Sequence, residues 1–162
     1  MQFKPPTAAL LAACALLACA DPKDPAPSTT QCTKHEHTTH PKNMLWTVEV
    51  PTTDLDRAIT FYQHILDIRI DEVDMGNTRM GVLPGANGAA AVVLVNGEGY
   101  VPTQTGTLAY LEAGDDLQPI LDKVSKHGGQ VILPKTEISP EMGYFALFTD
   151  TEGNKLGLHS TK

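Results

Sequence analysis

The sequence predicts an α+β domain made of two copies of one strand-helix-strand-strand-strand unit. Short runs alternate apolar and polar residues with period two, and two longer segments carry apolar residues at helical spacing. The order of these runs recurs, because Asp54-Leu55 at the first helical segment returns as Asp116-Leu117 at the second. Recurrence of one unit at a fixed distance indicates a duplicated module. We place the domain at residues 45–160.

Each unit opens with a strand that leads into an amphipathic helix. Thr53 is the expected N-cap of the first helix, where Asp54 and Asp56 suit the positive end of the helix dipole. Asp115-Asp116 opens the second helix, and Gly128-Gly129 ends it. The expected strands, in chain order, are residues 45–50, 68–73, 78–83, 89–95, 107–111, 130–133, 144–149 and 155–159.

The first twenty residues are typical of a secretory signal, with Lys4 followed by an almost wholly apolar stretch. Cys14 and Cys19 both lie where a bacterial lipoprotein signal places the cysteine that receives a diacylglycerol. We favour Cys19, with residues 1–19 as the signal peptide, because cleavage at Cys14 would leave the apolar residues 15–18 exposed. The expected location is the cell envelope, on the periplasmic or outer-membrane side, with the N-terminal lipid holding the chain to the membrane.

Residues 20–43 are expected to form a disordered tether, because they contain too few apolar residues to offset the entropy lost on ordering. The tether ends in a cluster of one thiol and three imidazoles, which are ligand types for Zn²⁺, Ni²⁺ or Cu²⁺. A solvated linker that binds no metal is the other interpretation. The cluster consists of Cys32, His35, His37 and His40.

The formal net charge of −7 at pH 7 argues against a nucleic-acid partner, which would favour a basic surface. The glycine-rich residues 85–88 are not followed by a helix, so they do not form a phosphate-binding loop. A small-molecule ligand is therefore the partner that we expect.

Four segments resemble the glyoxalase/bleomycin-resistance/dioxygenase superfamily, also called the vicinal oxygen chelate superfamily: residues 48–62, 106–108, 133–138 and 143–160. The resemblance covers essentially the whole predicted domain. Asp67 stands where the family usually has a glycine at the helix end, and aspartate tolerates the left-handed backbone needed there. The resemblance implies two βαβββ modules that pair into a curved, barrel-like sheet of eight strands around a cavity, and a homodimer is a further expectation.

Family enzymes hold a divalent metal through His, Gln or Glu on the first and last strands of each module. Aligning the two modules with that pattern puts the first-strand positions at Leu45 and Thr107. The last-strand positions fall at Val93 or Leu94 and at Gly157. None of these residues is a usual metal ligand, so we expect neither a bound metal nor another cofactor in the cavity.

Strand alternation gives the candidate site residues. Thr47 and Glu49 are expected to face the cavity, with Trp46, Val48 and Val50 facing the helix. Glu49 is the candidate catalytic base, and the alternative makes it a rim residue paired with Arg79. The candidate ligand-binding residues are Thr47, Arg79, Glu137, Tyr144 and His159, whereas Phe61, Tyr62, Phe145, Leu147 and Phe148 are assigned to the core.

Two classes of function remain open because this fold hosts both. One is a metal-independent lyase or isomerase that acts on a small polar metabolite. The other is a binding module of the resistance type, which sequesters a small molecule without converting it. A third interpretation makes the His-bearing tether a metal scavenger with the domain as its carrier.

Overall fold

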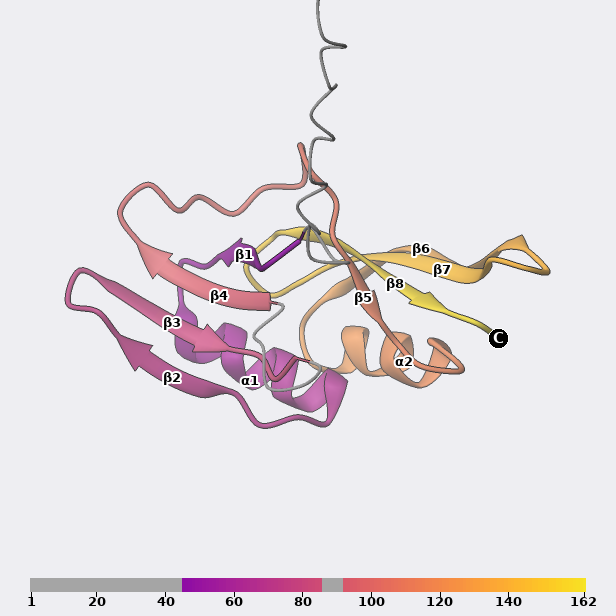
Figure 1. Ribbon diagram of the computed structural model, residues 1–162, viewed down its shortest axis with the longest axis horizontal. Helices are drawn as coiled ribbons and strands as arrows, with labels where there is room; N and C mark the ends of the chain where they lie inside the picture. The colour runs from indigo at the N-terminus through magenta and orange to yellow at the C-terminus, as the bar shows by residue number, and fades with distance from the viewer. Residues whose placement is uncertain (1–44, 86–91) are drawn as a thin grey trace, which may run out of the picture. The chain divides into compact units, whose positions relative to one another are not determined.

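The computed structural model describes residues 45–85 and 92–162, which form two successive modules. In the first, β1 (Val48–Pro51) leads through α1 (Leu55–Leu66) to β2 (Asp71–Asp74), β3 (Thr78–Val82) and β4 (Val92–Gly97). In the second, β5 (Tyr110–Glu112) leads through α2 (Gln118–Lys126) to β6 (Gln130–Ser139), β7 (Gly143–Thr149) and β8 (Lys155–Ser160). The predicted α+β class and the duplicated unit are confirmed (Figure 1).

Each module forms its own four-stranded sheet, with strand order β1-β4-β3-β2 in the first and β5-β8-β7-β6 in the second. In both sheets the opening strand runs parallel to the last strand, and the remaining pairs are antiparallel. The two sheets stay separate, so the expected barrel-like sheet does not close. No strand of one sheet pairs with a strand of the other, so β1 and β5 both remain edge strands. The modules instead contact each other through their helices and through the loop before β8, where Glu152 accepts a hydrogen bond from Arg57.

The predictions for the signal peptide, for lipidation at Cys19 or Cys14 and for the tether fall outside the described residues. The beginning of the strand expected at 89–95 lies outside them as well. Within residues 45–85 and 92–162, no helix is long and apolar enough to cross a membrane.

Helix α1 is amphipathic and buries an apolar stripe that includes Leu55, Ile59 and Ile65. Its N-cap is Asp54, whose carboxylate accepts a hydrogen bond from the backbone N–H of Arg57 at 3.0 Å. The expectation that Thr53 caps this helix is therefore wrong. As predicted, the helix ends at Asp67, which adopts the left-handed backbone with φ of 54°.

Helix α2 begins after Leu117 without a side-chain cap, and Pro119 lies in its first turn, where no intrahelical N–H is needed. It ends at His127, followed by Gly128 at a φ of +95°, in agreement with the predicted stop at the glycine pair. The helix buries Leu121 and Val124 against its own sheet.

The helices cover one face of each sheet and also pack against each other. Phe61 and Tyr62 of α1 meet the second module, with the rings of Phe61 and Phe148 centred 6.3 Å apart. These three aromatic side chains are buried, so their assignment to the core is confirmed. One core therefore spans both modules, and each sheet keeps a second face that the helices do not cover.

Candidate functional site

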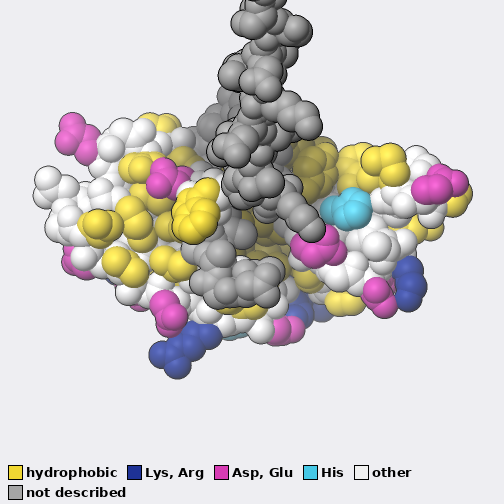
Figure 2. Space-filling view, in the orientation of Figure 1, with side chains coloured by type: hydrophobic (Ala, Val, Ile, Leu, Met, Phe, Trp, Pro, Cys, Tyr) yellow, Lys and Arg dark blue, Asp and Glu magenta, His cyan; other side chains and the backbone are white. Residues whose placement is uncertain are grey.

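A pocket of about 340 Å³ lies on the uncovered face of the second sheet. Each of the four strands contributes one lining residue: Tyr110 from β5, Ile138 from β6, Phe145 from β7 and His159 from β8. Their neighbours Leu111, Ala146 and Leu158 are buried in the core, so strand alternation directs the pocket residues away from the helices. Figure 2 shows hydrophobic side chains at the surface over β6, β7 and β8, with a histidine beside them.

The floor of this pocket is the ring of Tyr110 lying on the backbone of Gly157. The two residues are neighbours in the parallel pairing of β5 with β8. A Cβ atom at position 157 would lie 2.3 Å from the Cδ1 atom of Tyr110, so the ring would have to shift to admit any side chain there. A glycine within a strand often marks such a close approach. Glycine at position 157 is therefore what leaves room for the tyrosine ring at this position.

His159 supplies the imidazole of the pocket, whose other polar group is the hydroxyl of Tyr110. Its Nε2 atom lies 2.8 Å from the carbonyl oxygen of Met142. Because a carbonyl only accepts hydrogen bonds, Nε2 carries the proton, and in the neutral ring Nδ1 is left as an acceptor. The neighbouring Glu112, which pairs with His159 in the sheet, accepts a hydrogen bond from the backbone of Gly114.

Glu49 lies on the uncovered face of the first sheet. Its neighbour Val50 is buried beneath the helix, so alternation places Glu49 on the opposite face. The hydroxyl of Tyr100 donates to the carboxylate of Glu49 at 2.9 Å, and this hydrogen bond raises the pKa of Tyr100 above its ordinary value. Glu49 is thus an exposed acceptor with one phenol partner.

Arg79 lies on the other side of that sheet, against α1. It donates to Asp56 at 2.8 Å and to Glu72 at 3.0 Å. The alternative interpretation, in which Glu49 pairs with Arg79, is therefore wrong, because alternation puts the two residues on opposite faces. Trp46 was expected to face the helix, but it lies before β1 and is 82% exposed.

The remaining predicted site residues do not join the pocket. Tyr144 packs partly against the core, and the ammonium group of Lys135 lies 4.7 Å from its ring centroid. Glu137 is exposed and pairs with Tyr144 between β6 and β7. The hydroxyl of Thr47 is buried, with no hydrogen-bond partner among the described residues. Of the predicted ligand-binding residues, the structure thus brings only His159 into this pocket.

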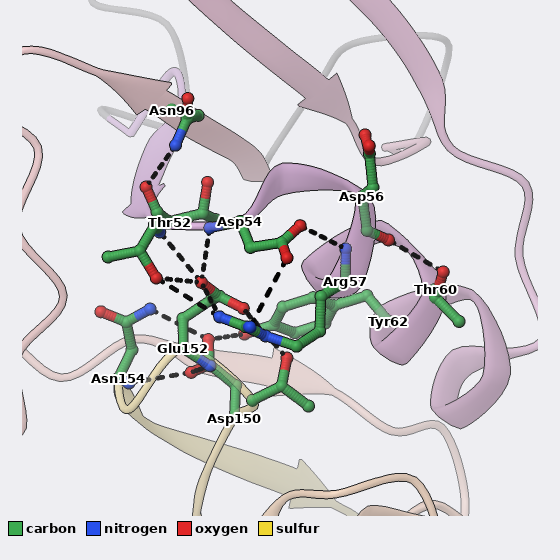
Figure 3. Close-up of polar contacts among 12 residues, drawn as sticks. Thr52, Asp54, Asp56, Arg57, Thr60, Tyr62, Asn96, Asp150, Glu152 and Asn154 are labelled. Atoms are coloured by element: carbon green, nitrogen blue, oxygen red, sulfur yellow. Dashed lines mark hydrogen bonds and ion pairs between the residues drawn. The ribbon is translucent and has the colours of Figure 1, made fainter.

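A second polar cluster joins the modules at the N-terminus of α1 (Figure 3). The carboxylate of Glu152 accepts hydrogen bonds from the backbone of Thr53 and Asp54 at 2.9 Å each, and from the hydroxyl of Thr53 at 2.8 Å. Arg57 donates to the same carboxylate from Nε at 2.8 Å and from Nη2 at 3.0 Å. The acidic group fills the anion-binding end of the helix, so the cluster is a structural clamp.

A buried network lies beneath this clamp. Tyr62 donates its hydroxyl hydrogen to Asp150 at 2.8 Å, and Asn154 donates to the same carboxylate. Burial, with the nearby Asp150 charge, raises the pKa of Tyr62 well above its ordinary value, so the phenol stays protonated. The side chain of Asn154 also donates to the carbonyl of Pro51, which ties the β7–β8 loop to the first sheet.

The residues present do not fit the metal site that the family resemblance implies. Within residues 45–85 and 92–162, no three His, Cys, Asp or Glu side chains gather in a metal-binding arrangement. Leu45 and Thr107 lie outside β1 and β5, which begin at Val48 and Tyr110. At Gly157, the space that a ligand side chain would need is filled by the ring of Tyr110.

Comparison with protein families decides the relationship. The model of the glyoxalase/bleomycin resistance protein/dioxygenase superfamily matches residues 44–158, which is most of the chain. The chain belongs to this superfamily. Solved members share the fold, including maize glyoxalase I, with a TM-score of 0.58 and 20% identity over 71% of this chain and 45% of that one. A superfamily domain from Frankia has a TM-score of 0.56 and 22% identity, over 72% of this chain and 90% of that one.

Curated relatives point to the same superfamily. The "Putative glyoxylase CFP32" of Mycobacterium tuberculosis is 28% identical over 121 residues, which cover 68% of this chain and 43% of that protein. A glyoxylase-like domain-containing protein of Didymella fabae is 25% identical, over 66% of this chain and 85% of that protein. The chain thus spans less than half the length of its mycobacterial relative.

Three pocket residues escaped the sequence analysis. Phe145 was assigned to the core, and Tyr110 and Ile138 were not singled out. The available signal was the alternation of β7, where Phe145 and Leu147 share one face and Ala146 and Phe148 share the other. The pairing of Tyr110 with Gly157 required the register of β5 on β8, which the sequence alone does not provide.

Proposed function

We propose that this domain is a small-molecule binding module of the resistance type, which holds its ligand in the pocket on the uncovered face of the second sheet. The observation that carries the proposal is the pocket itself, an apolar hollow with one histidine. Ligand pockets in proteins are typically apolar concavities of about 300–1,000 Å³ with a few placed polar groups. The pocket of about 340 Å³ lies at the lower end of that range.

In the part of the chain that the structure describes, no three His, Cys, Asp or Glu side chains gather as metal ligands, which supports binding through the side chains of the pocket. Tyr110 and Ile138 remain 49% and 42% exposed although they are apolar. Exposed apolar surface gathered around a hollow commonly marks an interaction site. A ligand that covered these side chains would remove apolar area from water, which provides the driving force for binding.

Native mass spectrometry of the full chain, purified from its own cells, tests this proposal. We expect an organic adduct on the wild-type chain that Ile138→Glu removes, because the new carboxylate would be desolvated by the ligand. Ile132→Glu is the matched control, since Ile132 is 45% exposed on the same strand and does not line the pocket. An adduct that persists in Ile138→Glu would place the ligand elsewhere.

A second candidate function is metal-independent acid–base catalysis of the lyase or isomerase type at Glu49. The observation that favours it is the carboxylate–phenol pair of Glu49 and Tyr100 on the uncovered face of the first sheet. Glu49 would act as the base, as the sequence analysis suggested. With methylglyoxal and a thiol as the test substrate, turnover that Glu49→Gln abolishes without lowering the melting temperature would establish this candidate. Absence of turnover in the wild type would leave the binding function alone.

We further propose that the mature chain is anchored in the cell envelope by lipid on Cys19. Residues 1–19 are typical of a lipoprotein signal, and residues 20–43 contain few apolar residues, as expected of a tether; both features support this proposal. Cys19→Ser is expected to move the protein from the detergent phase to the aqueous phase in a two-phase partition, with Cys14→Ser as the matched control. Loss of partitioning in Cys14→Ser instead would assign the lipid to Cys14.

A further inference from the structure

We propose that the ligand of the second-sheet pocket is a planar aromatic molecule with an O–H or N–H donor at its edge. Its ring stacks on Tyr110, and its donor group forms a hydrogen bond with His159. This inference rests on the proposed binding function and adds the chemical class of the ligand. It also assigns a role to Gly157, the position where the family resemblance implies a metal ligand.

Gly157 leaves room for an aromatic surface in the pocket, the ring of Tyr110. The ring of Tyr110 occupies the space that a side chain at position 157 would fill, and the tyrosine remains 49% exposed. A partly exposed ring that packs against the strand beside it offers a surface for stacking. A planar aromatic ligand has few rotatable bonds, so it loses little conformational entropy when it binds to such a surface.

Tyr110 and Phe145 present two aromatic rings to the pocket at an angle to each other. The centroids of Tyr110 and Phe145 lie 6.3 Å apart, with their ring planes inclined by 59°. A flat ring stacked on Tyr110 would therefore meet Phe145 at an angle, which combines the stacked and edge-to-face geometries that aromatic rings prefer. Ile138 completes the apolar wall.

His159 has one ring nitrogen hydrogen-bonded within the protein. Its Nε2–H is engaged by the carbonyl oxygen of Met142, so the imidazole is held in one orientation and one tautomer. In the neutral ring, Nδ1 has no hydrogen-bond partner among the described residues, so it can accept a hydrogen bond from a donor group of the ligand. A ligand without that donor would leave the imidazole nitrogen desolvated and unpaired, which lowers its affinity.

Three matched probes test the inference on the full chain: 2-naphthol, 2-methoxynaphthalene and decahydro-2-naphthol. The second lacks the O–H donor, and the third keeps the donor but is saturated and non-planar. Affinities are measured by NMR titration, with the ring signals of Tyr110 and Phe145 reporting binding at the pocket. We expect 2-naphthol to bind about three- to tenfold more tightly than either analogue, as the strength of aromatic and hydrogen-bonded contacts implies.

Variants test the aromatic contact with Tyr110 and the hydrogen bond to His159 separately. Tyr110→Leu is expected to weaken 2-naphthol about three- to tenfold and to leave decahydro-2-naphthol unchanged, whereas Tyr110→Phe keeps the ring and the affinity. His159→Leu is expected to abolish the preference for the donor, so that 2-naphthol and 2-methoxynaphthalene bind with equal affinity, because no imidazole nitrogen is left to be paired or desolvated. Trp46→Leu is the matched control, since it removes an exposed aromatic side chain that does not line the pocket.

Equal binding of 2-naphthol and decahydro-2-naphthol at the pocket, unaffected by Tyr110→Leu, would overturn the aromatic ligand class and leave the binding function intact. No change in the pocket signals with any probe would also refute this class of ligand. The proposed function would then be decided separately by the native adduct and its loss in Ile138→Glu.

Discussion

The clamp formed by Glu152 makes the sharpest prediction about stability. Replacing Glu152 with glutamine keeps the shape of the side chain but removes its charge. One amide oxygen can still accept from the backbone of Thr53 and Asp54, but the amide nitrogen would face the donors of Arg57. The loss is then one charge-assisted interaction at a side chain with 0% exposure, on the order of 1.5–3 kcal/mol.

Thermal denaturation followed by circular dichroism measures this effect. For a domain of this size about 1 kcal/mol corresponds to roughly 4 °C, so Glu152→Gln should lower the melting temperature by about 6–12 °C at pH 7. Glu98→Gln is the matched control, since Glu98 is exposed after β4, and its melting temperature should match the wild type.

The pH dependence provides a second readout of the same interaction. Burial alone would raise the pKa of Glu152, but hydrogen bonds from Arg57, Asp54 and Thr53 outweigh burial and hold this pKa below its ordinary value. A carboxylate with a lowered pKa stabilises the fold fully above its unfolded-state pKa, and this stabilisation is lost as the pH falls through the folded-state pKa. The difference between wild type and Glu152→Gln should therefore be constant from pH 6 to 8 and shrink below about pH 4.3. Equal stability at pH 7, or a difference that persists in strong acid, would refute this reasoning.

Three further predictions concern single substitutions. Gly157→Ala should displace the ring of Tyr110 and cost about 1–3 kcal/mol in chemical denaturation, because the added Cβ would overlap that ring; unchanged ring signals in NMR spectra would contradict the proposed floor of the pocket. Tyr62→Phe should cost about 1.5–3 kcal/mol in urea denaturation, since it removes a buried donor to Asp150; an unchanged midpoint would show that this bond contributes nothing. Arg79→Met should leave both the melting temperature and ligand titrations at the pocket unchanged, because Arg79 is exposed on the helix side of the first sheet; a weaker ligand would restore Arg79 as a binding residue.

Local sequence signals predicted the elements of the fold well. The recurrence of Asp54-Leu55 at Asp116-Leu117 located both helices, and Asp67 adopts the left-handed backbone expected at the helix end. These features depend on neighbours in the chain, which the sequence shows directly. The strands were predicted less exactly, since residues 68–73 were expected as a strand and β2 spans Asp71–Asp74.

Long-range contacts explain what the sequence analysis missed. Thr53 was expected to cap α1, but its hydroxyl donates to Glu152, which lies 99 residues away in the chain. One of the two interpretations of Glu49 paired it with Arg79, but the register of β3 on β4 and the position of α1 direct Arg79 to Asp56. The pocket shows the same limit, because Tyr110 meets Gly157 only through the pairing of β5 with β8.

Metal binding by the folded domain distinguishes a pocket that binds through side chains from a metal site of the family type. The measurement is native mass spectrometry of the full chain titrated with Zn²⁺, Ni²⁺ or Mn²⁺, with His35, His37 and His40 replaced by alanine to remove the candidate ligands of the tether. The account predicts that the domain holds no stoichiometric ion and that 2-naphthol binds equally with and without added metal. One tightly bound ion per chain, lost in His159→Ala or Glu49→Gln, would contradict the account and indicate a metal-assisted site of the family type.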